Sequence, residues 1–368
     1  MEKAKPKIII TGGGTGGHVY PAIAIADTIR KKRPDAEILF VGAKGKLESV
    51  KVPQAGYNII TLPVKGLPRR LSIKALVSFL DFIISIYKAK KIIKSFKPNI
   101  VIGVGGYASA PILYAVRKKN ICIFLQEQNS FPGLTNRYFA KYANKIFVAY
   151  EGLEKWFPTE KIIYSGNPVR NFYENMPSKK KALEYFNFKD NIPTIFLTGG
   201  SLGSETLNLS VLKNIDLILN NNIQFIWQTG KIYYNRIMSQ LKDKHLPNIV
   251  IKPFIDNMIY AYTAADLVIA RAGAITVSEL AILHKPVIFV PSPNVAEDHQ
   301  RKNALALVQK NAALIIDDNQ APQKLIKTAI EIVHNPEKLR KLSENIALFA
   351  KPQAADTIVD FILSCLEH

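Results

Sequence analysis

Cysteine is nearly absent from this sequence. The chain of 368 residues has only two cysteines, Cys122 and Cys365. Two cysteines cannot build a disulfide framework, and their scarcity is typical of proteins that stay in a reducing compartment such as the cytosol. The histidines are not clustered with cysteines either, which excludes a structural zinc or iron–sulfur site.

Acidic residues are also scarce relative to basic ones. The chain has 49 lysines and arginines against 29 aspartates and glutamates, a formal net charge of +20. This excess indicates an anionic partner: nucleic acid, a phosphorylated ligand or an acidic membrane surface. Because the lysines are scattered through both halves rather than set beside aromatic residues, we expect no nucleic acid partner.

Long hydrophobic runs are missing as well. Only the three isoleucines at 8–10 follow the basic N-terminus, so the sequence predicts no signal peptide. In the apolar stretch 72–94, Lys74, Asp81 and Lys88 interrupt every run that could span a membrane. A composition of 48% hydrophobic and 21% charged residues predicts a soluble globular protein.

What the sequence does contain is a regular alternation of short β-branched runs and longer helical patterns. Such runs are typical of strands buried on both faces, and the helices between them imply right-handed parallel crossovers. The length suits two domains, so we predict two doubly wound, Rossmann-like α/β domains. The predicted strands are 7–11, 37–41, 99–103, 121–125, 145–149, 161–164, 193–198, 224–228, 249–251, 267–270, 286–290 and 313–316.

Both halves open with the same pattern of strand, threonine, glycine turn and helix. IIITGGGTGG begins at residue 8, and IFLTGGSLGS begins at residue 195. The repeat predicts an N-terminal domain over 1–167 and a C-terminal domain over 168–349, which would face each other across a cleft. Pro168 blocks helix continuation at the junction. The amphipathic tail, about 350–368, is predicted to pack back on the N-terminal domain as a helix.

Four glycine turns follow predicted strands, at 12–17, 103–106, 199–204 and 271–273. Glycine lets an anion approach the backbone closely, and N–H groups at a helix start favour negative charge. The first turn fits G-x-G-x-x-G, but Lys44 follows the second strand, where a dinucleotide site needs an acidic residue. A nicotinamide-dependent oxidoreductase is therefore the weaker alternative, and a P-loop is excluded.

Three residues near these turns have two interpretations each. His18 is either a locally hydrogen-bonded histidine or a general base kept neutral by the positive end of a helix. Glu279 follows Thr276 at a capping-box spacing, so it either completes a helix start or accepts hydrogen bonds from a ribose diol. Arg170 is either a solvated surface residue or a bidentate clamp on a diphosphate.

Residues 73–87 read as a helix with two apolar faces and one polar face. Two apolar faces exceed what a single core contact needs. With basic residues at both ends, such a helix suits the surface of an anionic membrane; a buried helix with solvated lysines is the alternative. The predicted polar face is Lys74, Ser78, Asp81, Ser85 and Lys88.

Seven blocks between residues 12 and 304 occur in a family's order: GGTGGHVYPAIAIA, GVGGYASAP, QEQNSFPGLTNR, GNPVR, GGSLGS, ARAGAITVSEL and EDHQRKNA. Together they resemble the MurG family, the bacterial UDP-N-acetylglucosamine:N-acetylmuramyl-(pentapeptide) pyrophosphoryl-undecaprenol N-acetylglucosaminyltransferases. The resemblance implies the glycosyltransferase B arrangement and an inverting transfer of N-acetylglucosamine from UDP to the 4-hydroxyl of the muramyl sugar of lipid I. It also implies a peripheral protein at the cytoplasmic face of the inner membrane, working in peptidoglycan synthesis. No Asp-x-Asp motif is present, and we expect neither a metal nor a cofactor.

The resemblance also assigns site residues. Ile255 would face uracil, Glu279 would hold the ribose, and Tyr107 would contact the acceptor. The base would be His18 or Glu127, because this chain has Gln126 where many relatives have histidine. A second departure, Leu202 in place of glutamine, removes a possible polar contact to the donor. The implied donor-binding residues are Thr15, Gly16, Gly17, Asn129, Arg170, Ser201, Ile255, Ala274, Ile275, Thr276, Val277, Ser278, Glu279 and Gln300.

Overall fold

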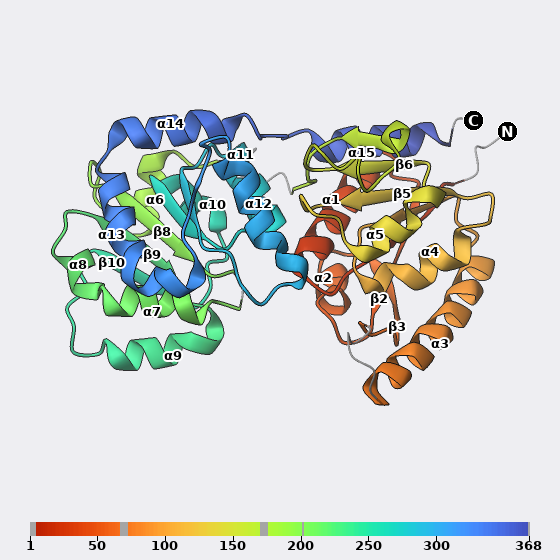
Figure 1. Cartoon of the computed structure of the whole chain (residues 1–368), viewed down its shortest axis with the longest axis horizontal. Helices are drawn as coiled ribbons and strands as arrows, with labels where there is room; N and C mark the ends of the chain where they lie inside the picture. Colours follow the sequence, from red (N-terminus) through yellow and green to blue (C-terminus); the bar gives the residue numbers. More distant parts are fainter. Residues whose placement is uncertain (1–4, 67–72, 170–175, 201, 367–368) are drawn as a thin grey trace. The chain divides into compact units, whose positions relative to one another are not determined.

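The computed structural model describes residues 5–66, 73–169, 176–200 and 202–366 of the chain (Figure 1). Internal contacts divide the chain into two compact units: unit 1 comprises residues 1–170 and 351–368, and unit 2 comprises residues 171–350. Each unit is built around its own parallel β-sheet. The prediction of two doubly wound α/β domains is therefore confirmed.

Unit 1 contains a seven-stranded sheet in the order β3-β2-β1-β4-β5-β6-β7. The central strand β1 pairs in parallel with β2 and β4, which places Ile9 beside Leu39 and Val101. The sequence prediction missed only β3, an edge strand whose alternating burial gives no continuous apolar run. The strands are β1 Lys7–Thr11, β2 Glu37–Ala43, β3 Asn58–Leu62, β4 Ile100–Gly103, β5 Cys122–Glu127, β6 Lys145–Val148 and β7 Ile162–Tyr164.

Helices cover both faces of this sheet (Figure 1). Ile8 and Ile10 of β1 share a core with α1 and the C-terminal helix α15, whereas Ile9 points into the core beneath α3 and α4. On the surface, Lys32 of α1 lies 2.9 Å from a carboxylate of α15. The helices are α1 Gly16–Lys32, α2 Glu48–Gln54, α3 Ile73–Phe96, α4 Ala110–Val116, α5 Leu134–Phe139 and α15 Ala354–Ser364, with 3-10 turns η1 Tyr107–Ser109, η2 Ala140–Tyr142 and η3 Thr159–Lys161.

The two cysteines are joined by a disulfide, contrary to the expectation of reduced cysteines. Cys122 begins β5 and Cys365 follows α15. The return of α15 to unit 1 brings these residues together although they are 243 positions apart in the sequence. No local pattern around either cysteine could have predicted this pairing, because it depends on where the last helix packs.

The first half of α3 carries its apolar side chains on the outside. The predicted polar face lies partly against unit 1: Ser78 and Ser85 are buried, the Asp81 carboxylate is paired with Lys65 at 2.9 Å, and Lys88 is exposed. The side chain of Lys74 lies outside the described part of the chain. Small serines let the helix pack closely on unit 1, so the large apolar residues point away from it. No helix within the described ranges is long and apolar enough to cross a membrane. We call the exposed set the apolar face of α3: Leu76, Val77, Phe79, Leu80, Ile83, Ile84 and Tyr87.

Unit 2 contains a six-stranded parallel sheet in the order β10-β9-β8-β11-β12-β13, the strand order typical of a Rossmann domain. Its first strand, β8, lies in the middle of the sheet, as β1 does in unit 1. The strands are β8 Thr194–Thr198, β9 Gln224–Gln228, β10 Ile249–Lys252, β11 Leu267–Ala270, β12 Val287–Phe289 and β13 Leu314–Ile315. The helices are α6 Lys179–Tyr185, α7 Glu205–Lys213, α8 Ile215–Leu219, α9 Lys231–Gln240, α10 Met258–Ala264, α11 Ala274–Ile282, α12 His299–Val308, α13 Ala321–Val333 and α14 Pro336–Ala347, with 3-10 turns η5 Ala296–Asp298 and η6 Asp318–Gln320.

Candidate active site

The first glycine turn of unit 1 is folded around a buried carboxylate. Glu48, at the start of α2, is 2% exposed; its Oε2 accepts a hydrogen bond from the Gly14 N–H at 2.8 Å, and its Oε1 accepts one from the Ala43 N–H at 2.9 Å. Gly13 has φ +148°, and a Cβ atom there would lie 2.2 Å from the Glu48 carboxyl carbon. Only glycine fits this position. Part of the glycine pattern therefore makes room for Glu48, which the sequence prediction did not identify.

The second glycine turn of unit 1 lies against the first. A Cβ atom at Gly106 would be 2.6 Å from the carbonyl oxygen of Gly13, and one at Gly14 would be 3.6 Å from the ring of Tyr107. Burial, with a smaller effect of the Glu48 charge, raises the pKa of Tyr107, which keeps the phenol neutral. The predicted acceptor residue Tyr107 thus lies where the two turns meet.

Thr15 and His18 interact at the start of α1. Thr15 is the N-cap residue, with φ −139° and ψ 161°, and its Oγ1 lies 3.1 Å from His18 Nδ1. On the other side of the ring, a Cβ atom at Gly105 would lie 3.2 Å from His18 Nε2. His18 is half-buried and lies between the helix start and the second glycine turn. Gly17, in the first turn of α1, would meet only the Thr15 hydroxyl with a Cβ atom.

Glu127 organises the loop that follows β5. It is 2% exposed, and its carboxylate accepts hydrogen bonds from the N–H groups of Asn129 and Gly133, both at 3.1 Å, and from the Asn136 amide at 2.9 Å. Burial raises the pKa of Glu127, and these hydrogen bonds oppose the rise. The Asn129 side chain also donates to Glu127, at 3.3 Å. Two predicted site residues, Glu127 and Asn129, are therefore hydrogen-bonded to each other.

Gln126 is fully buried beside this loop. Its amide nitrogen donates to Asn167 Oδ1 at 3.0 Å, and its amide oxygen accepts from Gln128. Asn136 donates to the Gln126 carbonyl at 3.0 Å and lies beside Gly105, so it connects Glu127 with the turn that packs against His18. Gln126 has a structural role in this network, and Asn136 is a second residue that the sequence prediction missed.

The glycine turn after β8 in unit 2 is held by Gln228 of β9. Gln228 is 2% exposed; its amide nitrogen donates to Thr198 Oγ1 at 2.9 Å and to the Gly200 carbonyl at 3.3 Å, and its amide oxygen accepts from the Ile255 N–H at 2.9 Å. Ile255 itself is buried. One amide thus links a glycine turn predicted to favour an anion with the residue predicted to face uracil.

The same turn contains one glycine in a crowded position and one in an open position. A Cβ atom at Gly203 would lie 2.2 Å from the Thr229 carbonyl oxygen, whereas one at Gly200 would meet nothing within 4 Å. Ser204 caps α7, and its hydroxyl accepts from Arg271 Nη2 at 2.5 Å. The open space at Gly200 lies on a turn that Arg271 and the packed Gly203 hold in place.

Glu279 lies inside α11 and not at its start. The N-cap of this helix is Gly273, so Thr276 and Glu279 do not occupy the two capping-box positions, and that interpretation is wrong. The Tyr262 hydroxyl donates to Glu279 Oε2 at 3.2 Å. Burial raises the pKa of Glu279 to about 7, and the hydrogen bond from Tyr262 opposes the rise.

The other predicted donor residues of unit 2 lie at the N-terminal ends of two helices. Residues 274–278 form the first turn of α11, where Ser278 donates back to the Ala274 carbonyl at 3.1 Å. Gln300 lies in the first turn of α12 and accepts from the Ser292 N–H at 2.9 Å. The first N–H groups of a helix lack acceptors within the helix, so such ends attract anions. Two predicted residues lie outside the described ranges: Arg170 and Ser201.

Both units match models of one glycosyltransferase family. Residues 8–148 match the glycosyltransferase family 28 N-terminal domain, and residues 194–358 match the glycosyltransferase family 28 C-terminal domain. Relatives named UDP-N-acetylglucosamine–N-acetylmuramyl-(pentapeptide) pyrophosphoryl-undecaprenol N-acetylglucosamine transferase match the whole chain. The one from Parabacteroides distasonis is 50% identical over 99% of both chains, and the one from Cytophaga hutchinsonii is 48% identical over 100% of this chain and 99% of its own. The chain belongs to the MurG family.

Solved structures agree with this assignment to the MurG family. MurG from Acinetobacter baumannii superposes with a TM-score of 0.74 at 25% identity, over 98% of this chain and 99% of that one. A UDP-N-acetylglucosamine 2-epimerase from Neisseria meningitidis superposes with a TM-score of 0.68 at 16% identity, over 98% of this chain and all of that one, which shows the shared fold alone. The predicted resemblance to MurG and the predicted enzyme class, a glycosyltransferase, are confirmed.

Proposed function

We propose that this chain transfers N-acetylglucosamine from UDP-N-acetylglucosamine to the 4-hydroxyl of the N-acetylmuramyl sugar of lipid I, with inversion at the anomeric carbon. The product is lipid II, for peptidoglycan synthesis. The observation that carries the proposal is the 50% identity, over 99% of both chains, to a relative named for this transfer. The arrangement of side chains within each unit supports it.

Unit 2 binds the UDP part of the donor in this proposal. Ile255 lies against uracil, the open turn at Gly200 takes the diphosphate, and Glu279 accepts hydrogen bonds from the ribose hydroxyls. Gln228 fixes the distance between Ile255 and the turn at Gly200, because its amide is hydrogen-bonded to the backbone of both residues. The further donor residues are Ser201, Gln300 and Ala274–Ser278 in unit 2, Thr15, Gly16, Gly17 and Asn129 in unit 1, and Arg170 at the boundary between the two units.

His18 is the general base. In the tautomer whose Nδ1–H donates to Thr15 Oγ1, Nε2 carries the lone pair that removes the proton from the acceptor 4-hydroxyl. That oxygen attacks the anomeric carbon while the bond from this carbon to the UDP oxygen breaks. Glu127 is a positioning residue, because its carboxylate is buried and holds Asn129, Gly133 and Asn136. Tyr107, beside the first glycine turn, contacts the acceptor.

The leaving UDP gains negative charge as the bond breaks. Backbone N–H groups aimed at this charge stabilise it most when they are already in place before the reaction. The start of α11 at Gly273 and the turn at Gly200 supply such groups in unit 2, and glycine leaves room for the phosphates at both. Lys and Arg outnumber acidic residues by 49 to 29, which favours the approach of both anionic substrates.

The apolar face of α3 is the contact with an anionic membrane, where the lipid-linked acceptor lies, and the chain is peripheral to the inner membrane on its cytoplasmic side. Seven apolar side chains of this face are 45–61% exposed, an arrangement that isolated soluble proteins avoid. Lys88 and Lys91 follow directly along the helix and are placed to pair with anionic headgroups.

Incubation with radiolabelled UDP-N-acetylglucosamine and a lipid I analogue tests the proposal. We expect label in the lipid fraction and a β-linked product by the NMR coupling of the anomeric proton. His18→Ala, matched in concentration, is the control for enzyme-dependent transfer. Release of labelled free sugar, or conversion of the donor to its 2-epimer without label in lipid, would contradict the proposed function.

A further inference from the structure

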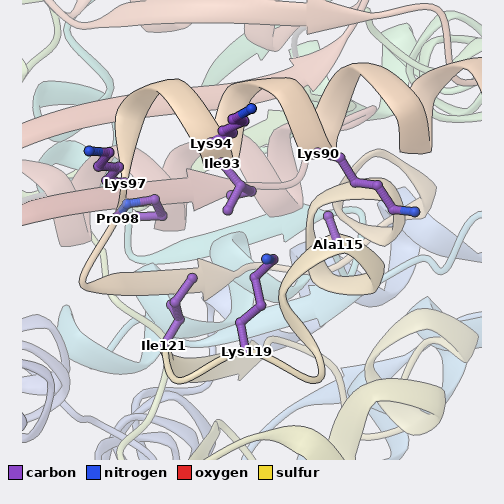
Figure 2. A pocket seen from close by; sticks show the side chains of 8 residues that line it. All are labelled: Lys90, Ile93, Lys94, Lys97, Pro98, Ala115, Lys119 and Ile121. Atoms are coloured by element: carbon purple, nitrogen blue, oxygen red, sulfur yellow. The ribbon is translucent and has the colours of Figure 1, made fainter.

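A basic pocket lies in unit 1, away from the residues discussed above. It has a volume of about 510 Å³, and its walls include Lys90, Ile93, Lys94, Lys97, Lys119 and Ile121. Figure 2 shows Lys119 extending from the loop before β5 toward α3. Lys97 precedes β4 and Ile121 precedes β5, whereas the glycine turns follow β1 and β4. The pocket therefore lies at the N-terminal ends of the strands of unit 1, whereas the glycine turns of unit 1 lie at the C-terminal ends.

Four lysines line this pocket, and in Figure 2 their side chains point in different directions from its walls. The described residues that line it include no aspartate or glutamate. α3 ends at Phe96, next to the lining residue Lys97, and α4 ends at Val116, next to the lining residue Ala115. The C-terminal end of each helix carries roughly half a negative charge. Two helix ends therefore offset only about one of the four ammonium groups. The remaining positive charge favours an anionic ligand.

Lys97 adds an observation about the backbone. Its φ is +53°, the left-handed conformation that glycine or asparagine usually adopts after a helix. Its N–H caps α3 by donating to the Ile93 carbonyl at 3.0 Å, a bond that glycine would make equally well. Lys97 thus adds a charged side chain to the wall of the pocket at a backbone position that glycine would occupy at lower cost.

We propose that this pocket binds an organic phosphate. The phosphate pairs with the lysine ammonium groups, and the carbon part of the ligand lies on Ile93 and Ile121. A volume of about 510 Å³ falls in the range of small-molecule sites and exceeds what a bare phosphate ion fills. The phosphate belongs either to a phospholipid headgroup or to a soluble phosphate ester. This site is separate from the donor and acceptor sites of the proposed function.

Calorimetric titration with glycerol 3-phosphate tests the pocket. Both variants compared keep the donor site intact, so any binding there is common to both. The test variant is Lys90→Gln with Lys97→Gly and Lys119→Gln. Lys94 is kept because a lysine in the last helical turn stabilises α3. The matched control, Lys118→Gln with Lys242→Gln and Lys310→Gln, removes the same charge from residues outside the pocket. We expect about a tenfold loss of affinity in the test variant, from three weak ion pairs, and less than a twofold change in the control.

Vesicles of phosphatidylcholine, with and without phosphatidylglycerol, distinguish the two sources. For a lipid headgroup, the test variant sediments less than the control variant with phosphatidylglycerol vesicles; for a soluble ester, the two variants sediment equally. If circular dichroism shows the test variant unfolded, Lys119→Gln alone replaces it, with an expected loss of about threefold. The proposal is overturned if glycerol 3-phosphate binds no better than chloride at equal ionic strength and both variants sediment alike.

Discussion

The Tyr262 hydroxyl donates a hydrogen bond to Glu279 Oε2 at 3.2 Å. This contact helps to set the protonation state of Glu279, the residue proposed to bind the ribose. Burial raises the pKa of Glu279 from 4.5 to about 7, while the hydrogen bond from Tyr262 acts in the opposite direction. The carboxyl is therefore largely protonated at pH 6 and largely ionised at pH 8. Both protein stability and donor binding should depend on pH across this interval.

Glu279→Gln should weaken donor binding about tenfold at pH 8 and less at pH 6. An ionised carboxylate accepts from both ribose hydroxyls, and hydrogen bonds to charged groups are worth about 1.5–3 kcal/mol, or a factor of ten for each 1.4 kcal/mol. Calorimetry of UDP-N-acetylglucosamine binding at both pH values measures this, with the exposed Glu331→Gln as control. Equal donor affinity in wild type and Glu279→Gln at pH 8 would leave Glu279 only a partner of Tyr262.

The same substitution should change how stability depends on pH. Between about pH 4.5 and pH 7, folded Glu279 retains a proton that the unfolded chain has released. Its contribution to the free energy of unfolding therefore falls as pH rises through this window and is constant above it. Glutamine has no such proton, so the difference in melting temperature between Glu279→Gln and wild type should shift in favour of the variant from pH 5 to pH 8. A difference independent of pH would refute the raised pKa.

Tyr262→Phe should move the pH dependence of donor binding to higher pH. The phenylalanine ring can keep the edge-on contact with Phe196, whose ring centre is 5.7 Å away, so packing is preserved. Without the hydroxyl, ionised Glu279 loses a donor, and its pKa rises further. We expect the midpoint of the pH–affinity curve to rise by roughly one unit. An unmoved midpoint would show that another group controls the pH dependence.

His18→Ala should lower kcat by roughly two to four orders of magnitude, the usual effect of removing a general base. The dissociation constant of the donor should change little, because the base acts on the acceptor hydroxyl. Thr15→Val removes the hydroxyl that lies 3.1 Å from His18 Nδ1. It should lower kcat less than His18→Ala, because the imidazole is kept but is no longer held in one orientation. Rapid-quench kinetics with a soluble lipid I analogue measures both. A kcat loss below tenfold in His18→Ala would assign proton removal to solvent or another residue.

Much of the fold was predictable from the sequence because parallel strands buried on both faces leave continuous apolar runs. β1 and β9 begin and end at the predicted residues. β3 was missed because its residues alternate between exposed and partly buried, so Ile59 and Ile60 are not part of a continuous buried run. The disulfide between Cys122 and Cys365 was missed because it depends on the packing of α15.

The sequence identified the four glycine turns, whereas the space beside each glycine is visible only in the structure. A Cβ atom at Gly200 would meet nothing within 4 Å, and one at Gly17 would meet only the Thr15 hydroxyl; the binding roles of these turns stay predictions. Glu48 and Gln228 were missed because each acts through contacts with residues far along the chain, which leave no local pattern. Glu279 was ambiguous because spacing from Thr276 cannot show where α11 begins.

Glu48→Gln should destabilise unit 1 and disturb the first glycine turn. The carboxylate satisfies two backbone donors, Gly14 and Ala43, whereas an amide offers one oxygen and turns an N–H₂ group toward the other donor. An unsatisfied buried polar group costs about 1–3 kcal/mol, so we expect the melting temperature to fall by roughly 3–10 °C. Glu37→Gln, which removes an exposed ion pair with Lys7, should cost less than about 1 kcal/mol. Similar melting temperatures for the two variants would contradict the role of Glu48.

Replacing Phe79, Leu80 and Ile83 of α3 by serine should reduce sedimentation with anionic vesicles at least tenfold. These side chains are 48–53% exposed, and each buries apolar area in the membrane at about 25 cal/mol per Å². Because about half of each side chain is already exposed and serine lowers helix propensity only modestly, the melting temperature should fall only slightly. The matched control, Leu217, Ile232 and Leu348 to serine, removes three side chains that are 37–77% exposed in unit 2 and should sediment like wild type. Turnover of a short-chain soluble acceptor should be unchanged in both variants. A large drop in melting temperature in the α3 variant, or equal sedimentation of the two variants, would mean that this face is not the membrane contact.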